Sequence, residues 1–281
     1  MLNSTPVRVL SFIVLALLAG TMLIPLWSIT ATAFSSKFAS LQPGIILWPA
    51  PFSLEGFATL FSRLDFIRPL LNTLMLTVTG TAVHVLLAAM AGFVLAQENL
   101  PGRRLIGALI LLTLTIPSQI MMVPMFVLFR QAGLLNTWFS LWLSGTVSAF
   151  SILLMKSYFE QVPAALVDSA RLDGAGNYAL LRHVYLPLAL PGVLTVAAFQ
   201  VVYRYNMFTE PLLFITDADK LTLQIALKSI ILSESATSTN DFIAPNVQMA
   251  GILLALLPLL VFYPFMQRYL VRGMLIGAVK G

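Results

Sequence analysis

The chain has 281 residues, no cysteine and a formal net charge of +5. Hydrophobic residues make up 59% of the chain and charged residues 10%, whereas a soluble domain carries roughly 25% charged residues. These values exclude an ordinary soluble domain, and the missing cysteines exclude structural disulfides, thiolate nucleophiles and Cys-ligated zinc. The two histidines, His84 and His183, make a poor ligand set. We therefore expect an all-α polytopic membrane protein with no metal site.

Six apolar segments are each near the length that crosses a bilayer, which takes about 20 helical residues. They lie at about 9–33, 70–96, 105–129, 137–156, 187–214 and 247–271, so one membrane domain over residues 1–281 accounts for the length. The first segment follows Arg8 and ends in Ala-Thr-Ala, as a cleaved signal peptide does. Its apolar run is much longer than a signal core of about 7 to 15 residues, which favours a retained span.

The distribution of basic residues predicts the orientation, because cytoplasmic loops retain Lys and Arg. With the N-terminus inside, the cytoplasmic segments carry nine basic and four acidic side chains, a balance of +5. The outer segments then carry six of each, and Arg204 and Glu210 cancel within the fifth span. This favours an N-in, C-in topology. Anionic lipids of the inner leaflet explain the basic excess, so no nucleic-acid partner is needed.

Polar residues within the spans are the first candidates for a solute path, because buried polar groups in lipid are expensive and usually face a cavity. Asn72 begins the second span, where it is a helix cap or a pore residue. His84 lies inside the same span, where a bond to a neighbouring helix is the simpler explanation. Gln119 lies in a Met-rich run between Pro117 and Pro124, which lines the path or only packs.

Residues 158–186, between the fourth and fifth spans, are unusually charged. Pro163 suits a first helical position, and Ala164 to Asp173 are mostly helix formers that end at Gly174, a residue able to take the left-handed conformation that terminates helices. A second short helix is expected over about 177–185. The pattern predicts a cytoplasmic helix-turn-helix with an apolar side that must dock, either on its own membrane domain or on a partner.

The fifth span carries a polar stripe in the sequence FQVVYRYNMFTEP. At 100° per residue, Gln200, Tyr203, Asn206 and Glu210 share one broad face, with Arg204 on its flank. Aromatic rings and these polar groups suit a sugar, and Arg204 suits an acidic one. The alternative is that Asn206 and Glu210 bond across to a neighbouring subunit and that the tyrosines sit at the membrane interface. Both interpretations remain open.

The charged stretch EQVPAALVDSARLDGAGNYALLRHVYLPLALPG resembles the EAA loop of permease subunits in bacterial ABC importers. Asp168, Ser169 and Ala170 stand where the family has Glu-Ala-Ala, and Gly174 stands at its glycine. The changes to Asp168 and Ser169 alter the reach and charge placement of the docking contact. Other segments, including LLNTLMLTVTGTA and the tail QRYLVRGMLIGAVKG, are similar to the maltose-type carbohydrate branch, and residues 244–269 to a sub-branch for uronate-containing oligosaccharides.

The resemblance implies a six-helix permease in the bacterial cytoplasmic membrane, with its loop seated in a cytoplasmic ATPase through Asp168, Ser169, Ala170, Arg171, Asp173 and Gly174. It implies a sister permease, two ATPase subunits that bind ATP and magnesium, an extracytoplasmic sugar-binding protein and surrounding lipid. The chain itself is expected to bind no cofactor and to catalyse no reaction. No phosphate-loop motif occurs, since Ala108 stands where that motif has lysine after Gly102 and Gly107.

A proton-coupled secondary transporter of a small polar solute is the alternative from another class. It would need a titratable relay inside the membrane and usually paired repeats, yet only Glu210 is a plausible intramembrane acid. The segment KLTLQIALKSIIL at 220–232 is too short to span and too apolar for a free loop. We expect it to form an external helix over the pore or against a sugar-binding protein.

Overall fold

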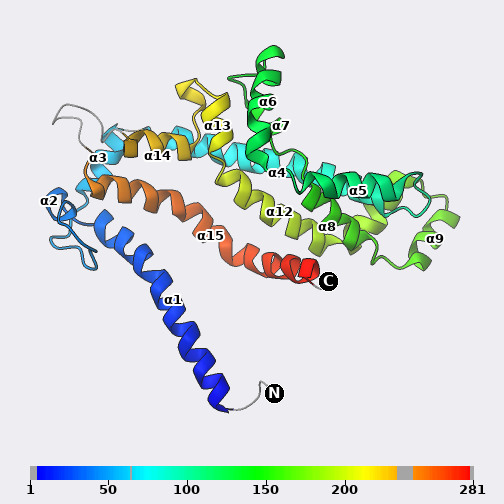
Figure 1. Ribbon diagram of the computed structural model, residues 1–281, viewed down its shortest axis with the longest axis horizontal. Helices are drawn as coiled ribbons and strands as arrows, with labels where there is room; N and C mark the ends of the chain where they lie inside the picture. The colour runs from blue at the N-terminus through cyan, green and yellow to red at the C-terminus, as the bar shows by residue number, and fades with distance from the viewer. Residues whose placement is uncertain (1–4, 64, 233–242, 279–281) are drawn as a thin grey trace. The chain divides into compact units, whose positions relative to one another are not determined.

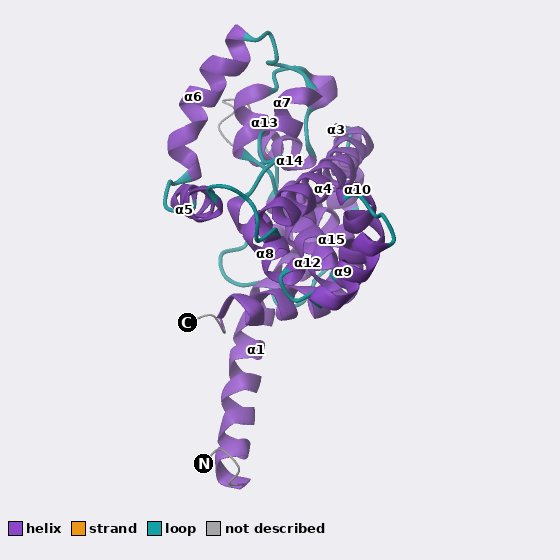
Figure 2. Ribbon diagram, turned by 90° about the vertical axis from the view of Figure 1, so that its right-hand side faces the viewer, coloured by secondary structure: helices purple, strands orange, loops and turns teal. Residues whose placement is uncertain are grey.

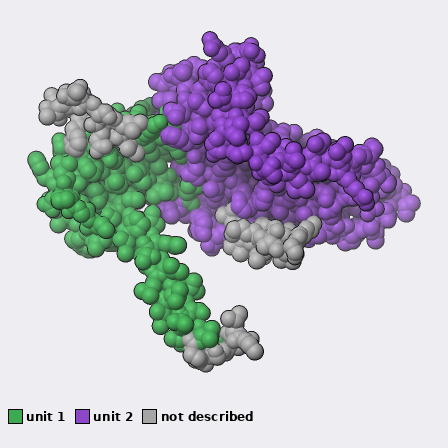
Figure 3. Space-filling model, in the orientation of Figure 1, with its two compact units in different colours: residues 1–67, 223–259 green, residues 68–222, 260–281 purple. Residues whose placement is uncertain are grey.

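The computed structural model describes residues 5–63, 65–232 and 243–278. Within these residues the regular structure is helical, apart from one β-bridge between Ser35 and Phe52 (Figure 2). This confirms the all-α prediction. The chain divides into two compact units, residues 1–67 with 223–259 and residues 68–222 with 260–281 (Figure 3).

The first unit contains α1 (Thr5–Ala33), α2 (Lys37–Ser40), α3 (Glu55–Arg63), α14 (Leu223–Leu232) and the first part of α15 (Pro245–Ala278). Two glycines let its helices approach closely. A Cβ on Gly56 would lie 2.8 Å from the carbonyl oxygen of Asn246, and one on Gly251 would lie 2.7 Å from a methyl of Leu227. The helix predicted within 220–232 is thus confirmed as α14.

The second unit holds most of α4 (Ile67–Ala96) and the helices that follow it to residue 222. These are α5 (Arg103–Thr113), α6 (Ser118–Gln131), α7 (Trp138–Leu143), α8 (Ala149–Phe159), α9 (Ala164–Leu172), α10 (Asn177–Leu180), the π-helix η1 (Leu181–Tyr185), α11 (Leu186–Leu188), α12 (Leu190–Tyr205), α13 (Thr209–Phe214) and the 3₁₀-helix η2 (Ala218–Lys220).

A buried core in the second unit joins α4, α8 and the segment around α9 to η1. Gly92 permits contact between α4 and α8, because a Cβ there would lie 2.7 Å from Cβ of Met155. Phe93, Phe159 and Tyr185 pack edge to face around one point, with ring centroids 5.0 Å apart for Phe93 and Tyr185 and 5.5 Å for Phe159 and Tyr185. Such aromatic contacts stabilise a fold by more than their buried area alone. The charged segment, residues 158–186, therefore packs on a well-packed aromatic core.

Three described helices are long and apolar enough to cross a membrane by themselves, over Val7–Ala33, Ile67–Ala96 and Pro245–Tyr269. Two further pairs qualify only as bent spans, α5 with α6 at 97° and Asn177–Leu188 with α12 at 81°. Figure 1 shows α6 turning away from α5. The bend between α5 and α6 coincides with Pro117, which lacks an N–H for helical bonding.

The structure differs from the prediction of one continuous helix over 137–156 and another over 187–214. The first segment is divided into α7 and α8 around Gly145, whose φ of 97° lies in the left-handed region that favours glycine. The second is divided between α12 and α13. Asn206 follows the last residue of α12, and its side-chain amide donates to the carbonyl oxygen of Val202 at 2.8 Å, a local bond of the kind that competes with helix continuation.

Candidate functional site

The helix-turn-helix module, residues 163–186, ends its first helix with a glycine turn. Gly174 has φ of 84°. Its N–H donates to the carbonyl oxygen of Arg171 at 3.0 Å, and the N–H of Ala175 donates to that of Ala170 at 2.9 Å. This pair of bonds is the Schellman arrangement, which needs a left-handed residue at the Gly174 position. The predicted helix stop at Gly174 is therefore confirmed.

The module buries one side and exposes the other. Val167, Leu180 and Tyr185 are 6%, 1% and 8% exposed and belong to the core that contains Phe93 and Phe159. The residues predicted to couple, Asp168, Ser169, Arg171, Asp173 and Gly174, are exposed, and Ala170 is half-buried. The module is thus docked on its own unit through apolar side chains, while its charged face remains open to a partner.

Polar contacts join the module to the end of α4, and the residue Glu160 before the module to α5 and α8. Arg171 donates to the side-chain oxygen of Gln97 at 3.3 Å. Glu160, just before the module, pairs with Arg103 at 2.5 Å and with Lys156 at 2.9 Å. Arg103 also donates to the carbonyl oxygen of Leu95 at 2.8 Å. The Arg171 side chain thus links the module directly to the residue that follows α4.

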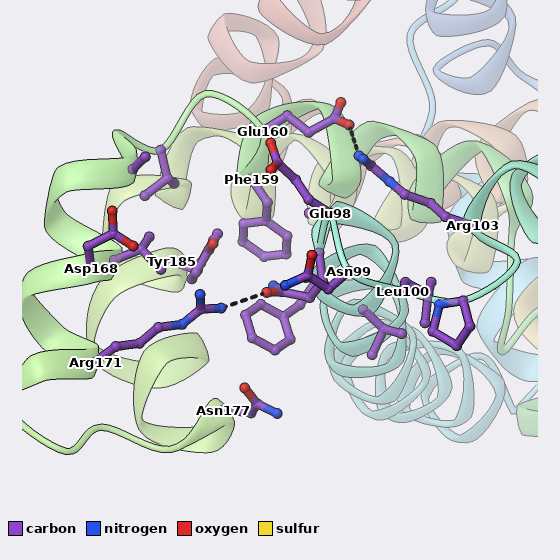
Figure 4. Close-up of a pocket in the computed structure, with 18 residues that line it drawn as sticks. Glu98, Asn99, Leu100, Arg103, Phe159, Glu160, Asp168, Arg171, Asn177 and Tyr185 are labelled. Carbon is purple, nitrogen blue, oxygen red and sulfur yellow. Dashed lines mark hydrogen bonds and ion pairs between the residues drawn. The ribbon is translucent and has the colours of Figure 1, made fainter.

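A pocket of about 830 Å³ lies between the module and the α4–α5 loop. Figure 4 shows Arg171 reaching from α9 toward the part of the loop that holds Glu98 and Asn99, with Tyr185 and Phe159 between the two walls. Asp168 and Asn177 also line the pocket. Residues from both the buried and the exposed sides of the module thus line this pocket.

A second cavity, of about 850 Å³, collects several of the residues predicted for a solute path. Gln119, Gln200, Tyr203 and Glu210 all line it, together with Met121, Met122 and Met125. The Tyr203 hydroxyl donates to Glu210 Oε1 at 2.8 Å, across the break between α12 and α13. Most of its lining is apolar, but amide, hydroxyl and carboxylate groups reach it from α6, α12 and α13, and we call it the polar cavity after these groups.

The other predicted path residues lie elsewhere. Arg204 is 1% exposed, and its guanidinium donates to the carbonyl oxygens of Leu141 at 2.5 Å and Trp142 at 3.1 Å. Asn72 donates to the carbonyl oxygens of Asp219 at 2.9 Å and Leu221 at 3.0 Å. Asn206 is exposed, but none of the three is among the residues that line the polar cavity.

Gly145, Ser148 and Ser151 also line the polar cavity, although sequence reasoning did not select them. The Gly145 carbonyl oxygen accepts a bond from Gln200 at 3.1 Å and lies 3.0 Å from Nδ1 of His84. His84 Nε2 lies 2.8 Å from Ser151 Oγ. Because a carbonyl can only accept, Nδ1 carries the proton and Nε2 accepts from the serine. The expectation that His84 bonds a neighbouring helix is confirmed.

Among the described residues, no group of three or more His, Cys, Asp or Glu side chains is placed to hold a metal ion. The side chains at the two sites offer hydrogen bonds, ion pairs and apolar contacts. These interactions suit binding and docking.

Residues 65–276 match the family described as the binding-protein-dependent transport system inner membrane component. The chain belongs to this family. The permease is 31% identical over 266 residues to Protein LplC of Bacillus subtilis (strain 168), covering 92% of this chain and 90% of that one. It is 29% identical over 275 residues to the polygalacturonan/rhamnogalacturonan transport system permease protein YtcP of the same organism, and the alignment covers 95% of this chain and 96% of that one.

A solved structure resembles the whole permease. It is the crystal structure of a bacterial ABC transporter involved in the import of the acidic polysaccharide alginate. The matched chain is 26% identical, the TM-score is 0.85, and the alignment covers 95% of this chain and 98% of that chain. The permease is therefore a non-catalytic, multi-pass component of the bacterial inner membrane.

Proposed function

We propose that this permease forms half of the translocation path of an ATP-driven importer for oligosaccharides. The family supports import that depends on a binding protein, and the transport systems named for YtcP and for the solved structure handle polysaccharides or their fragments. The observation that carries the proposal is the pairing of an exposed, charged docking helix with a polar cavity in the same compact unit.

The polar cavity supports a sugar as the solute. Phe150, Phe199 and Tyr203 present aromatic rings among its lining, and sugars stack on such rings. Gln119, Gln200 and Glu210 offer side-chain groups that can bond hydroxyls. We infer that Tyr203, Glu210 and Gln119 contact the moving sugar, while Asn72, Arg204 and Asn206 support the path through the helix junctions that they bind.

In this proposal, a partner protein supplies the energy for transport. A helix-turn-helix module with Asp168, Ser169 and Arg171 on its exposed face is suited to a groove on a cytoplasmic ATPase, and the ATPase would bind ATP and magnesium. Each complex would hold this permease, a sister permease, two ATPase subunits and an extracytoplasmic sugar-binding protein. The six crossings would be α1, α4, α5–α6, α7–α8, α11–α13 and α15, with both termini in the cytoplasm and the whole chain forming one transmembrane domain.

Purification of the tagged permease from native membranes tests the assembly. We expect a second permease and an ATPase to co-purify, and orthovanadate to trap nucleotide on that ATPase and stop uptake. A permease that transports solute in vesicles without any ATPase would contradict the proposal and support a secondary transporter.

A further inference from the structure

A groove of about 840 Å³ runs along α5 and α8, apart from the polar cavity. It adjoins the pocket beside the module, with which it shares Glu98, Leu100 and Arg103. Its mouth holds the cations Arg103, Arg104 and Lys156. Its wall continues along Gly107, Leu111 and Leu153. Charged and apolar groups thus occupy successive parts of one groove.

The mouth of the groove carries a net positive charge. Arg103 and Lys156 share Glu160, and Glu98 also lines the groove. Three cations against these two carboxylates leave a balance of +1. Arg104 is exposed, and among the described residues it has no ion-pair partner. A single anion at the mouth would therefore meet Arg104 without displacing the pairs that Glu160 already makes.

The wall of the groove is open apolar helix surface. No side chain of the eleven-residue helix α5 is buried, and Leu111 is 54% exposed. A Cβ added at Gly107 would meet nothing within 4 Å. Water solvates such a surface poorly, so a ligand for the whole groove needs a long apolar part next to its anionic group.

We propose that this groove binds an anionic phospholipid of the cytoplasmic leaflet. Its phosphate lies at Arg103, Arg104 and Lys156, and an acyl chain lies over Gly107, Leu111 and Leu153. The inference rests on the proposed function, because the N-in orientation puts the start of α5 at the inner leaflet, where anionic lipids attract basic segments. A free phosphate would use the cations but not the apolar wall.

The test measures lipid binding to the purified complex in nanodiscs of phosphatidylcholine with increasing phosphatidylglycerol. We expect phosphatidylglycerol to raise the melting temperature and to be retained when the complex is returned to detergent. Arg104→Gln should weaken this binding about fivefold, the size of one exposed ion pair. Gly107→Leu should block the acyl position without disturbing the helix, because leucine is a better helix former than glycine.

Two control variants match these changes. Arg130→Gln removes one exposed cation from the end of α6, and Gly107→Ala adds only a methyl to the groove; both should bind phosphatidylglycerol as the wild type does. Wild-type binding in both Arg104→Gln and Gly107→Leu would overturn the proposal. Equal stabilisation by glycerol phosphate alone would also overturn it, because that result indicates a site for a small anion. Loss of a protein subunit from the Gly107→Leu complex, with its lipid content unchanged, would overturn it as well, because that result indicates a protein contact at Gly107.

The orientation is checked separately, so that failure of the two proposals can be told apart. The chain contains no cysteine, and a single Arg104→Cys substitution reports its side of the membrane to an impermeant maleimide. Labelling from the outer face would overturn the inner-leaflet assignment. Lipid binding requires no transport, so a complex that retains phosphatidylglycerol but does not import sugar would count against the proposed function alone.

Discussion

At the scale of single residues, two glycines with positive φ set the geometry of the two candidate sites. Gly174 turns the helix-turn-helix module, and Gly145 separates α7 from α8 beside the polar cavity. A Cβ at Gly145 would lie 2.9 Å from Cε1 of Tyr203, so this glycine also leaves room for the tyrosine ring. The sequence identified Gly174 because a helical pattern stops there. Gly145 lies in the sequence SGTVS, where Ser-Gly is a turn signal. The interpretation of 137–156 as one apolar segment did not use this signal.

Replacing Gly174 with alanine should uncouple ATP hydrolysis from uptake. A Cβ at Gly174 meets nothing within 4 Å, so the penalty of about 1 kcal/mol comes from the left-handed backbone alone. Gly176 is the matched control, because it is also exposed and open but has φ of −73°. We expect binding-protein-stimulated hydrolysis and uptake to fall in Gly174→Ala and to persist in Gly176→Ala. Equal behaviour of the two variants would remove the role assigned to the turn.

Substitutions in the polar stripe should separate path residues from supporting ones. Glu210→Gln and Tyr203→Phe should change the sugar concentration for half-maximal uptake about fivefold, because each alters one bond of about 1 kcal/mol. Arg204→Met should instead lower assembly and stability by about 2 kcal/mol, since it removes the charged donor from the carbonyl oxygens of Leu141 and Trp142. Those oxygens then keep only the hydroxyl donors Ser144 and Thr146. Normal assembly of Arg204→Met with altered sugar affinity would reverse these roles.

The different fates of these stripe residues show what a helical wheel can predict. The wheel grouped Gln200, Tyr203 and Glu210, and all three line one cavity. It could not place Arg204, because the acceptors of that side chain are carbonyl oxygens at the end of α7. Those oxygens are available to Arg204 only because the segment 137–156 forms two helices and not one. Mean hydropathy does not predict that break.

At the scale of helices and turns, charged side chains connect elements that apolar packing alone would leave independent. Glu160 joins Arg103 at the start of α5 to Lys156 near the end of α8. The side chains of Arg103 and Glu160 are each 29% exposed, so solvent screens the pair and its contribution is expected to be about 0.5 to 1 kcal/mol.

Glu160→Gln should therefore lower the melting temperature of the complex slightly, and by less at high salt. Glu98→Gln is the control, because Glu98 is exposed on the neighbouring loop and has no ion pair among the described residues. We expect the control to melt as the wild type does at every salt concentration. A salt-independent effect of Glu160→Gln would mean that packing, and not the ion pair, is disturbed.

The turn over residues 217–220 should be sensitive to acid. A bond from the backbone N–H of Asp219, followed by the Lys220 side chain, lowers the pKa of Asp217 below its ordinary value. Its charged form therefore favours the folded state at neutral pH, and this contribution is lost as pH falls through the lowered pKa. Asp217→Asn should melt below the wild type at pH 7, and the gap should close in acid. A constant gap would exclude the carboxylate charge as the cause.

At the scale of the whole molecule, composition predicted the fold class and basic residues predicted an orientation, because both depend on sums over many residues. The helix breaks depend on single backbone conformations and were harder to foresee. Pro117 indicates the break between α5 and α6, because proline lacks the N–H for a helical bond. The break after α12 had a comparable signal in Pro211, which lacks the N–H for a helical bond to the carbonyl of Met207.

The surface of the first span requires an apolar cover from outside the chain. None of the most apolar window of Val7–Ala33 is buried in the chain alone. Lipid or a neighbouring subunit must cover it, because water does not solvate such a surface well. The sequence predicted the span from the same apolarity that makes this cover necessary.

The central claim is that this permease imports its sugar with energy from a partner ATPase. Membrane vesicles that hold the complete complex should accumulate sugar when ATP and the loaded binding protein are supplied, even after an ionophore has collapsed the proton gradient. Gly174→Ala vesicles should keep only the basal ATP hydrolysis that occurs without binding protein, and should accumulate less sugar than Gly176→Ala vesicles. Uptake that vanishes with the gradient while ATP remains, or that continues without the ATPase, would contradict the account.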